Sequence, residues 1–138
     1  MDFMYRHGGI TLDADVEVLK PLDKFLVHPF FSGQEINNKI KITATMGSEP
    51  RHPFIGMILN YYHLVPFAPV PNTKFITELL NTIGTTKQSD GTLTFPQGVL
   101  YPQEVFCPYD HRRRVATPTD ATYTIHHFHA SWKGNKSV

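Results

Sequence analysis

Asp13 and Asp15 follow a short apolar segment near the start of the chain. In an extended strand side chains alternate between faces, so Asp13, Asp15 and Glu17 are expected to point the same way. Paired carboxylates suit a hard divalent cation such as Mg2+ or Mn2+, which takes oxygen ligands and bridges protein to substrate phosphates. The alternative is an amphipathic strand with its acids in water, because an Asp-x-Asp pattern is common by chance.

Three histidines near the other end of the chain, His126, His127 and His129, are also candidate metal ligands. In strand geometry His127 and His129 share one face, and His126 lies on the other. His127 and His129 could bind zinc in a small metal-binding module, although no third His or Cys has a suggestive spacing.

Short elements must position these side chains. Apolar spacing predicts helices over 53–63 and 74–83, the second capped by Thr73, and a short helix over 2–7 that ends at Gly8. Alternating or apolar runs predict strands. One covers 10–12 and has an extension over 16–19, and the others cover 40–46, 92–95, 99–101 and 123–128. The stretch 110–121 is expected to be a polar loop.

Bulk composition limits the classes of function. The chain has 138 residues, 41% hydrophobic and 18% charged, which suits one globular domain. A net charge of +1 does not indicate that the chain binds nucleic acid. The single cysteine, Cys107, cannot form an internal disulfide and shows no sign of activation; it fits a reducing compartment. We find no signal peptide and no transmembrane segment, and expect the chain in the cytoplasm or at the inner face of the membrane.

The absence of certain motifs narrows the chemistry further. The sequence contains no Gly-x-Ser-x-Gly element and no Gly-rich phosphate loop of the familiar types. Serine hydrolases and P-loop enzymes are therefore excluded.

The segment GGITLDADVEVLKPLDKFL, residues 8–26, resembles the DXD segment of a family of glycosyltransferases with a sugar-binding region, which make bacterial capsule polysaccharides and extend fungal mannans. The matching residues are Tyr5, Gly8, Gly9, Ile10, Asp13, Asp15, Pro21 and Leu22, with Thr11 in place of the usual aromatic residue. The segment YTIHHFHASW, residues 123–132, resembles the closing His and Ser-Trp element of the same family. Two separate motifs in the expected order are more specific than either motif alone.

The resemblance implies an α/β fold of the GT-A type, with a mixed sheet and flanking helices. It covers residues 1–138 as a single domain that corresponds to the C-terminal portion of the family's domain, with the N-terminal part missing. The implied function is metal-dependent transfer, retaining at the anomeric carbon, from a UDP- or GDP-sugar donor to a saccharide acceptor. The implied cofactor is Mn2+ or Mg2+.

The resemblance also assigns residues. It places the metal on Asp13, Asp15 and His126, and Asp13 and Asp15 are the expected catalytic residues because they act through the ion. The expected substrate-binding residues are Gly8, Gly9, Glu35, Ser131 and Trp132. Glu35 belongs to the segment PFFSGQE, and the alternative to a sugar-binding role is that Glu35 is a solvated acid in a loop. In the same segment, Phe30 and Phe31 are expected to be core residues.

Two rival hypotheses remain open. One is a truncated, non-catalytic remnant of such an enzyme, and the other is a small metal- or sugar-binding module. The stretch Asn72-Thr73-Lys74 departs from the family's usual Gly-Pro, which weakens any transfer of donor specificity. If strands are missing, strand 10–12 should present an unpaired apolar edge that promotes association.

Overall fold

The computed structural model describes residues 1–66 and 71–129. The helices are α1 (Asp2–His7), the 3-10 helix η1 (Asp23–Val27), α2 (Pro53–Leu64), α3 (Asn72–Ile83) and α4 (Gln103–Phe106). The strands are β1 (Gly9–Leu12), β2 (Val16–Val18), β3 (Phe30–Gly33), β4 (Thr45–Ser48), β5 (Thr86–Lys87), β6 (Leu93–Phe95), β7 (Gly98–Tyr101), β8 (Tyr109–Asp110), β9 (Val115–Ala116) and β10 (Thr124–His126).

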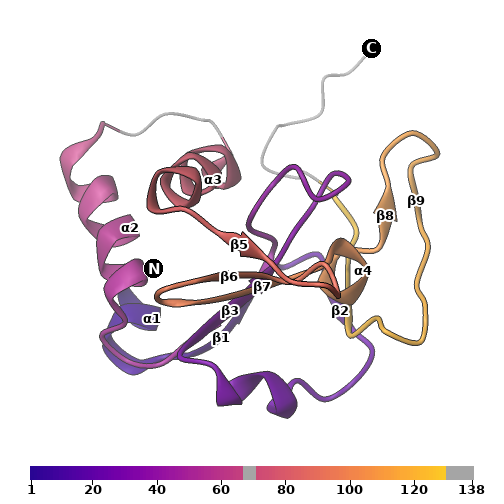
Figure 1. Cartoon of the computed structure of the whole chain (residues 1–138), viewed down its shortest axis with the longest axis horizontal. Coiled ribbons are helices and arrows are strands. Elements are labelled where there is room, and N and C mark those ends of the chain that lie inside the picture. The colour runs from indigo at the N-terminus through magenta and orange to yellow at the C-terminus, as the bar shows by residue number, and fades with distance from the viewer. Residues whose placement is uncertain (67–70, 130–138) are drawn as a thin grey trace.

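A mixed six-stranded sheet forms the centre of the molecule, in the order β1-β4-β3-β7-β6-β5 (Figure 1). Strands β3 and β7 pair in parallel, and the other neighbours pair antiparallel. Helices flank this sheet, so the expected α/β class with a mixed sheet is confirmed. Strand β1 lies at one edge, where its outer side pairs with no strand of the described residues.

Strand β3 separates two hydrophobic cores because its side chains alternate between the faces of the sheet. Phe30 packs with the buried faces of α2 and α3, including Phe54 and Leu80. Phe31 packs on the opposite side with Phe25 of η1 and Phe106 of α4. Phe30 and Phe31 are at most 1% exposed, which confirms the expectation that they are core residues.

The two long helices lie where apolar spacing predicts them. Helix α2 begins with Pro53 at its first position, where the missing N–H costs no hydrogen bond. Helix α3 begins at Asn72 with Pro71 as its N-cap residue, so the predicted cap at Thr73 was wrong. All helices of the described residues are too short or too polar to traverse a bilayer.

The predicted strand over 40–46 was wrong for most of its length, because β4 begins only at Thr45. Side chains take the hydrogen bonds that a neighbouring strand would make. The N–H of Lys41 donates to the Thr77 hydroxyl, and the N–H of Thr43 donates to the Ser32 hydroxyl. This stretch therefore crosses the end of β3 as an irregular segment.

Two small sheets complete the fold. Strand β2 pairs antiparallel with β10, with His126 opposite Val16. Strands β8 and β9 form a hairpin within the stretch that was expected to be only a polar loop. The first of these sheets brings the histidine cluster to the segment that carries the two aspartates.

Candidate metal site

The two aspartates lie in a tight turn at the end of β1. The N–H of Val16 donates to the carbonyl of Asp13 at 3.1 Å, which closes a four-residue turn, and the N–H of Asp13 donates to the carbonyl of Ala44. The turn, not an extended strand, brings Asp13 and Asp15 to the same side. Glu17 lies on the exposed surface in contact with His127, so the expectation that all three acids share one face was wrong for Glu17.

Two main-chain N–H groups that follow β10 donate hydrogen bonds to Asp15 in this turn. The N–H of His127 donates to the carbonyl of Asp15 at 3.0 Å. The N–H of His129 donates to Oδ2 of Asp15 at 2.8 Å. These bonds hold the His126 ring against the carboxylate, with Nε2 3.4 Å from Oδ1 of Asp15. The structure therefore brings together Asp15 and His126, which come from opposite ends of the sequence.

Glu35 lies on the other side of the same imidazole. It follows β3 and is only 4% exposed, so it is not a solvated loop acid. A bridge to Ile40 closes the loop behind it. Its Oε1 accepts a hydrogen bond of 2.6 Å from the Thr43 hydroxyl and lies 3.3 Å from Nδ1 of His126. The imidazole thus lies between two carboxylates, one at each ring nitrogen.

The electrostatics of this cluster favour a bound cation. Partial burial raises the pKa of Asp13, the nearby His126 lowers it, and the Asp15 and Glu35 carboxylates raise it, with a net rise. Burial by itself lowers the pKa of His126, but the hydrogen bond and charge of Glu35, together with Asp15 and Asp13, outweigh burial and raise it. Three carboxylates around one imidazole leave excess negative charge that a divalent ion would neutralise.

Two overlapping groups of side chains could hold a metal ion. One ligand atom each from Asp13, Asp15 and His126 lie within 4.8 Å of one another. The same holds for Glu35, Cys107 and His126. The first group is the set that the sequence resemblance assigns. The second contains Cys107, whose closeness to Glu35 and His126 no local pattern reveals, because both residues are far from it in the chain.

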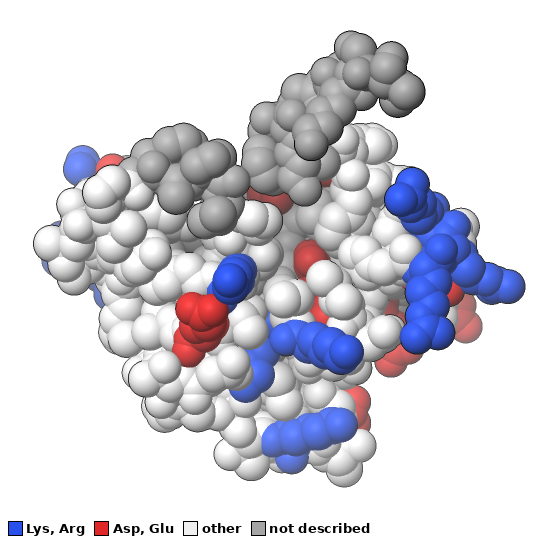
Figure 2. All heavy atoms as spheres, turned by 90° about the horizontal axis from the view of Figure 1, so that it is seen from above, with Lys and Arg blue, Asp and Glu red and all other residues white. Residues whose placement is uncertain are grey.

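A small cavity of about 40 Å³ opens beside the cluster. Its lining includes Asp13, Glu35, Thr43 and His126, and also Asn72 and Thr73 from the first turn of α3. Figure 2 shows Asp and Glu side chains at the bottom of a hollow in the middle of one face of the molecule. The volume suits an ion with its water, and a nucleotide sugar would reach this cavity with one end only.

A second cavity lies elsewhere on the molecule. It measures about 340 Å³ and is lined by residues from the end of η1 through β3 and by the end of β4, including His28, Phe31 and Glu49. It contains no group of three metal-ligating side chains among the described residues. The side chains that line this cavity therefore indicate no particular ligand, unlike those of the small cavity.

The remaining residues of the predicted site have different positions. Gly8 ends α1 and Gly9 begins β1, whereas Asp13 follows the other end of this strand, so the glycines are not part of the cluster. Gly8 has a φ of 68° and packs so closely on Pro50 that a side chain would collide with it. Ser131 and Trp132 lie outside the described residues.

Two further groups of polar side chains lie outside the small cavity. The rings of His127 and His129 share one face as expected, with centroids 5.6 Å apart, and His127 Nε2 lies 2.9 Å from Glu17. Basic side chains gather at the β8–β9 end of the molecule in Figure 2, where Arg112, Arg113 and Arg114 are exposed. Neither group borders the small cavity.

A scan against models of protein families and searches of curated proteins and of solved structures found no match to this chain.

Proposed function

We propose that this chain carries the metal site of a glycosyltransferase of the GT-A type, which transfers a sugar from a nucleotide-sugar donor to a saccharide acceptor. The observation that carries the proposal is the convergence of Asp13, Asp15 and His126, because the resemblance assigned the metal to these three residues. The donor atoms are oxygens and one imidazole nitrogen, which fits Mn2+ and is acceptable to Mg2+.

Each residue would have its own role in binding the ion. Asp13 and Asp15 would hold the ion with oxygen ligands, and His126 would add a ligand through Nε2 without adding negative charge. Nδ1 of His126 would then carry its proton and donate to Glu35, which fixes the ring orientation. A divalent ion at this position supplies positive charge to the phosphates of the departing nucleoside diphosphate.

The first turn of α3 supports an anionic ligand at the same place. Asn72 and Thr73 border the cavity, and no side chain of residues 1–66 or 71–129 makes a capping hydrogen bond at the start of this helix. The unpaired N–H groups and the dipole of a helix N-terminus favour a phosphate. A diphosphate between the ion and this helix would therefore be held from two sides.

Metal binding itself tests the proposal. We expect Mn2+ binding, followed by the electron paramagnetic resonance of free Mn2+, to weaken about tenfold or more in Asp15→Asn and His126→Gln. The matched control is His127→Gln, because His127 faces Glu17 on the exposed side. UDP and GDP should tighten Mn2+ binding in the unaltered chain, since their phosphates complete the coordination shell. Equal losses in His126→Gln and His127→Gln would contradict the assignment.

A second candidate function is metal binding without sugar transfer, as in a non-catalytic remnant or a small binding module. The observation that favours it is the small volume of the cavity, about 40 Å³. The two functions differ in their response to nucleotide. Mn2+ affinity that UDP and GDP leave unchanged would favour the second.

A further inference from the structure

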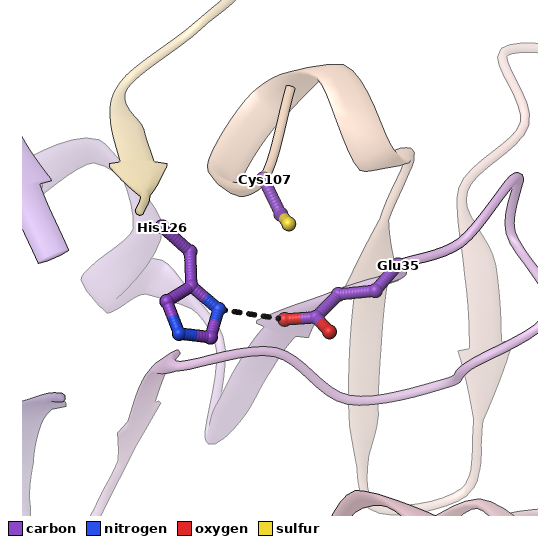
Figure 3. Close-up of side chains that lie close together, drawn as sticks. All are labelled: Glu35, Cys107 and His126. Carbon is purple, nitrogen blue, oxygen red and sulfur yellow. Dashed lines mark hydrogen bonds and ion pairs between the residues drawn. The ribbon is translucent and has the colours of Figure 1, made fainter. Parts of the chain in front are cut away.

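Cys107 lies close to both His126 and Glu35 (Figure 3). It follows the last residue of α4 and is fully buried. In Figure 3 its sulfur points toward the space between the His126 ring and the Glu35 carboxylate. A thiol, an imidazole and a carboxylate that converge at a buried position are not needed to fill a core, and this mixture of donors is typical of zinc.

The spacing of these three side chains is close to that of a zinc site. Their ligand atoms lie within 4.8 Å of one another. In tetrahedral zinc coordination, ligand atoms are roughly 3.3–3.6 Å apart, given Zn–S near 2.3 Å and Zn–N or Zn–O near 2.0–2.2 Å. A contraction of about 1 Å, within the reach of side-chain rotation, would complete the geometry. Three protein ligands leave a fourth position for water.

His126 belongs to both groups of ligands but offers a different nitrogen to each. Nε2 faces Asp15 at 3.4 Å, and Nδ1 faces Glu35 at 3.3 Å. A neutral imidazole has one nitrogen with a free lone pair, and the other carries the proton. An ion held through Nε2 and an ion held through Nδ1 therefore need opposite tautomers, and one neutral ring cannot serve both.

We propose that Glu35, Cys107 and His126 form a zinc site that competes with the Mn2+ site on Asp13, Asp15 and His126. Zinc bound through Nδ1 removes the lone pair of Nε2 from the neighbouring site and so inhibits Mn2+ binding there. Binding converts the Cys107 thiol to a thiolate, and its proton goes to solvent. The inhibition rests on the function proposed above, whereas zinc binding at Cys107 does not.

Cobalt is a suitable probe because Co2+ occupies zinc sites and gives a thiolate-to-metal charge-transfer absorption when sulfur is a ligand. We expect this absorption when Co2+ is added to the 138-residue chain, and its loss when Zn2+ displaces Co2+. Cys107→Ser should abolish the band and weaken Zn2+ binding about tenfold or more. His127→Gln should change neither, since His127 lies on the exposed side.

A thermal melt of Cys107→Ser, together with the larger-volume variant Cys107→Val, checks that loss of the band is not loss of the fold. If both variants melt as cooperatively as the unaltered chain and still show the charge-transfer band, the proposal is overturned. Zn2+ affinity that is unchanged in Cys107→Ser would also overturn it. That result would place the zinc on other residues.

Competition is measured separately. Zn2+ should release bound Mn2+ from the unaltered chain but not from Cys107→Ser. Asp15→Asn should lose Mn2+ binding and keep the cobalt band, which separates the two sites. A cobalt band in a chain that binds no Mn2+ would support the zinc site while contradicting the function proposed above. Simultaneous binding of both ions would overturn the competition.

Discussion

The hydroxyl of Thr43 donates a 2.6 Å hydrogen bond to Oε1 of Glu35, the same oxygen that faces Nδ1 of His126. Thr43 and Glu35 are 2% and 4% exposed, so water does not replace this bond easily. The hydroxyl fixes the carboxylate, and the carboxylate in turn orients the imidazole. One neutral side chain thus sets the geometry of a charged cluster.

Thr43→Val, which keeps the shape of the side chain and removes the hydroxyl, should lower the free energy of unfolding by about 1.5–3 kcal/mol, because a buried carboxylate loses its donor. Urea denaturation measures the change. Thr43→Ser keeps the hydroxyl and should lose less. A serine variant as unstable as the valine variant would show that the methyl group matters more than the hydrogen bond.

Gly47→Ala should destabilise the chain by about 1–3 kcal/mol, because the added methyl group overpacks the second core. A Cβ at this position would collide with the Phe31 ring, which Phe25 and Phe106 hold in place. Thermal unfolding measures the loss. Gly56→Ala is the control, since its Cβ would lie 3.1 Å from the partly buried Tyr5 ring and the substitution favours the helix.

His52 should make the chain less stable as the pH falls below its usual pKa of about 6.5. Burial lowers the pKa of His52 despite its hydrogen bond to the Gln97 carbonyl and the nearby charge of Glu49. The unfolded chain therefore binds this proton at a higher pH than the folded chain, and stability is lost from the ordinary pKa down to the lowered one. The cause is visible in the packing, because Nδ1 of His52 is buried without a partner among the described residues.

The measurement is the difference between the unaltered chain and His52→Gln, which keeps a donor for the Gln97 carbonyl. Free energies of unfolding between about pH 5 and pH 8 should fall more steeply with acid in the unaltered chain. Taking this difference removes the contribution of His126, whose raised pKa acts in the opposite direction. Parallel curves would show that His52 does not couple folding to protons.

Strand β1 should promote self-association, because it is an edge strand with an exposed apolar side chain. Leu12 is 40% exposed. Leu12→Lys should reduce concentration-dependent association in sedimentation velocity. Val115→Lys is the control, since Val115 is 46% exposed but lies on the β8–β9 hairpin. A chain that is monomeric at all concentrations, or equal effects of both variants, would contradict the role of this edge.

Long elements were predictable because their residues interact locally. The apolar spacing of 53–63 and 74–83 reflects one buried face of each helix, and α2 and α3 have nearly these bounds. The stretch 40–46 has the same alternation as a strand, and Ile42, Ala44 and Met46 are indeed buried. Its backbone is irregular because its partners are the side chains of Thr77 and Ser32, which no local pattern reveals.

In the candidate site, too, features that depend on local sequence were predicted and features that depend on tertiary contacts were not. The two motifs group Asp13, Asp15 and His126, and the structure brings one ligand atom of each within 4.8 Å of the others. The placement of Glu17 could not, because a turn at 13–16 replaces the expected alternation. Cys107 was missed because its proximity to Glu35 and His126 results from the packing of α4 against β3 and β10, which is a tertiary contact.

The opposite orientations of Phe30 and Phe31 affect how the molecule unfolds. Adjacent residues of β3 anchor the two cores, and all four residues of this strand are buried. Neither core can open without disturbing the backbone on which the other depends. The two faces of the sheet should therefore unfold in one cooperative step, and the amide protons of β3 should be among the last to exchange with solvent.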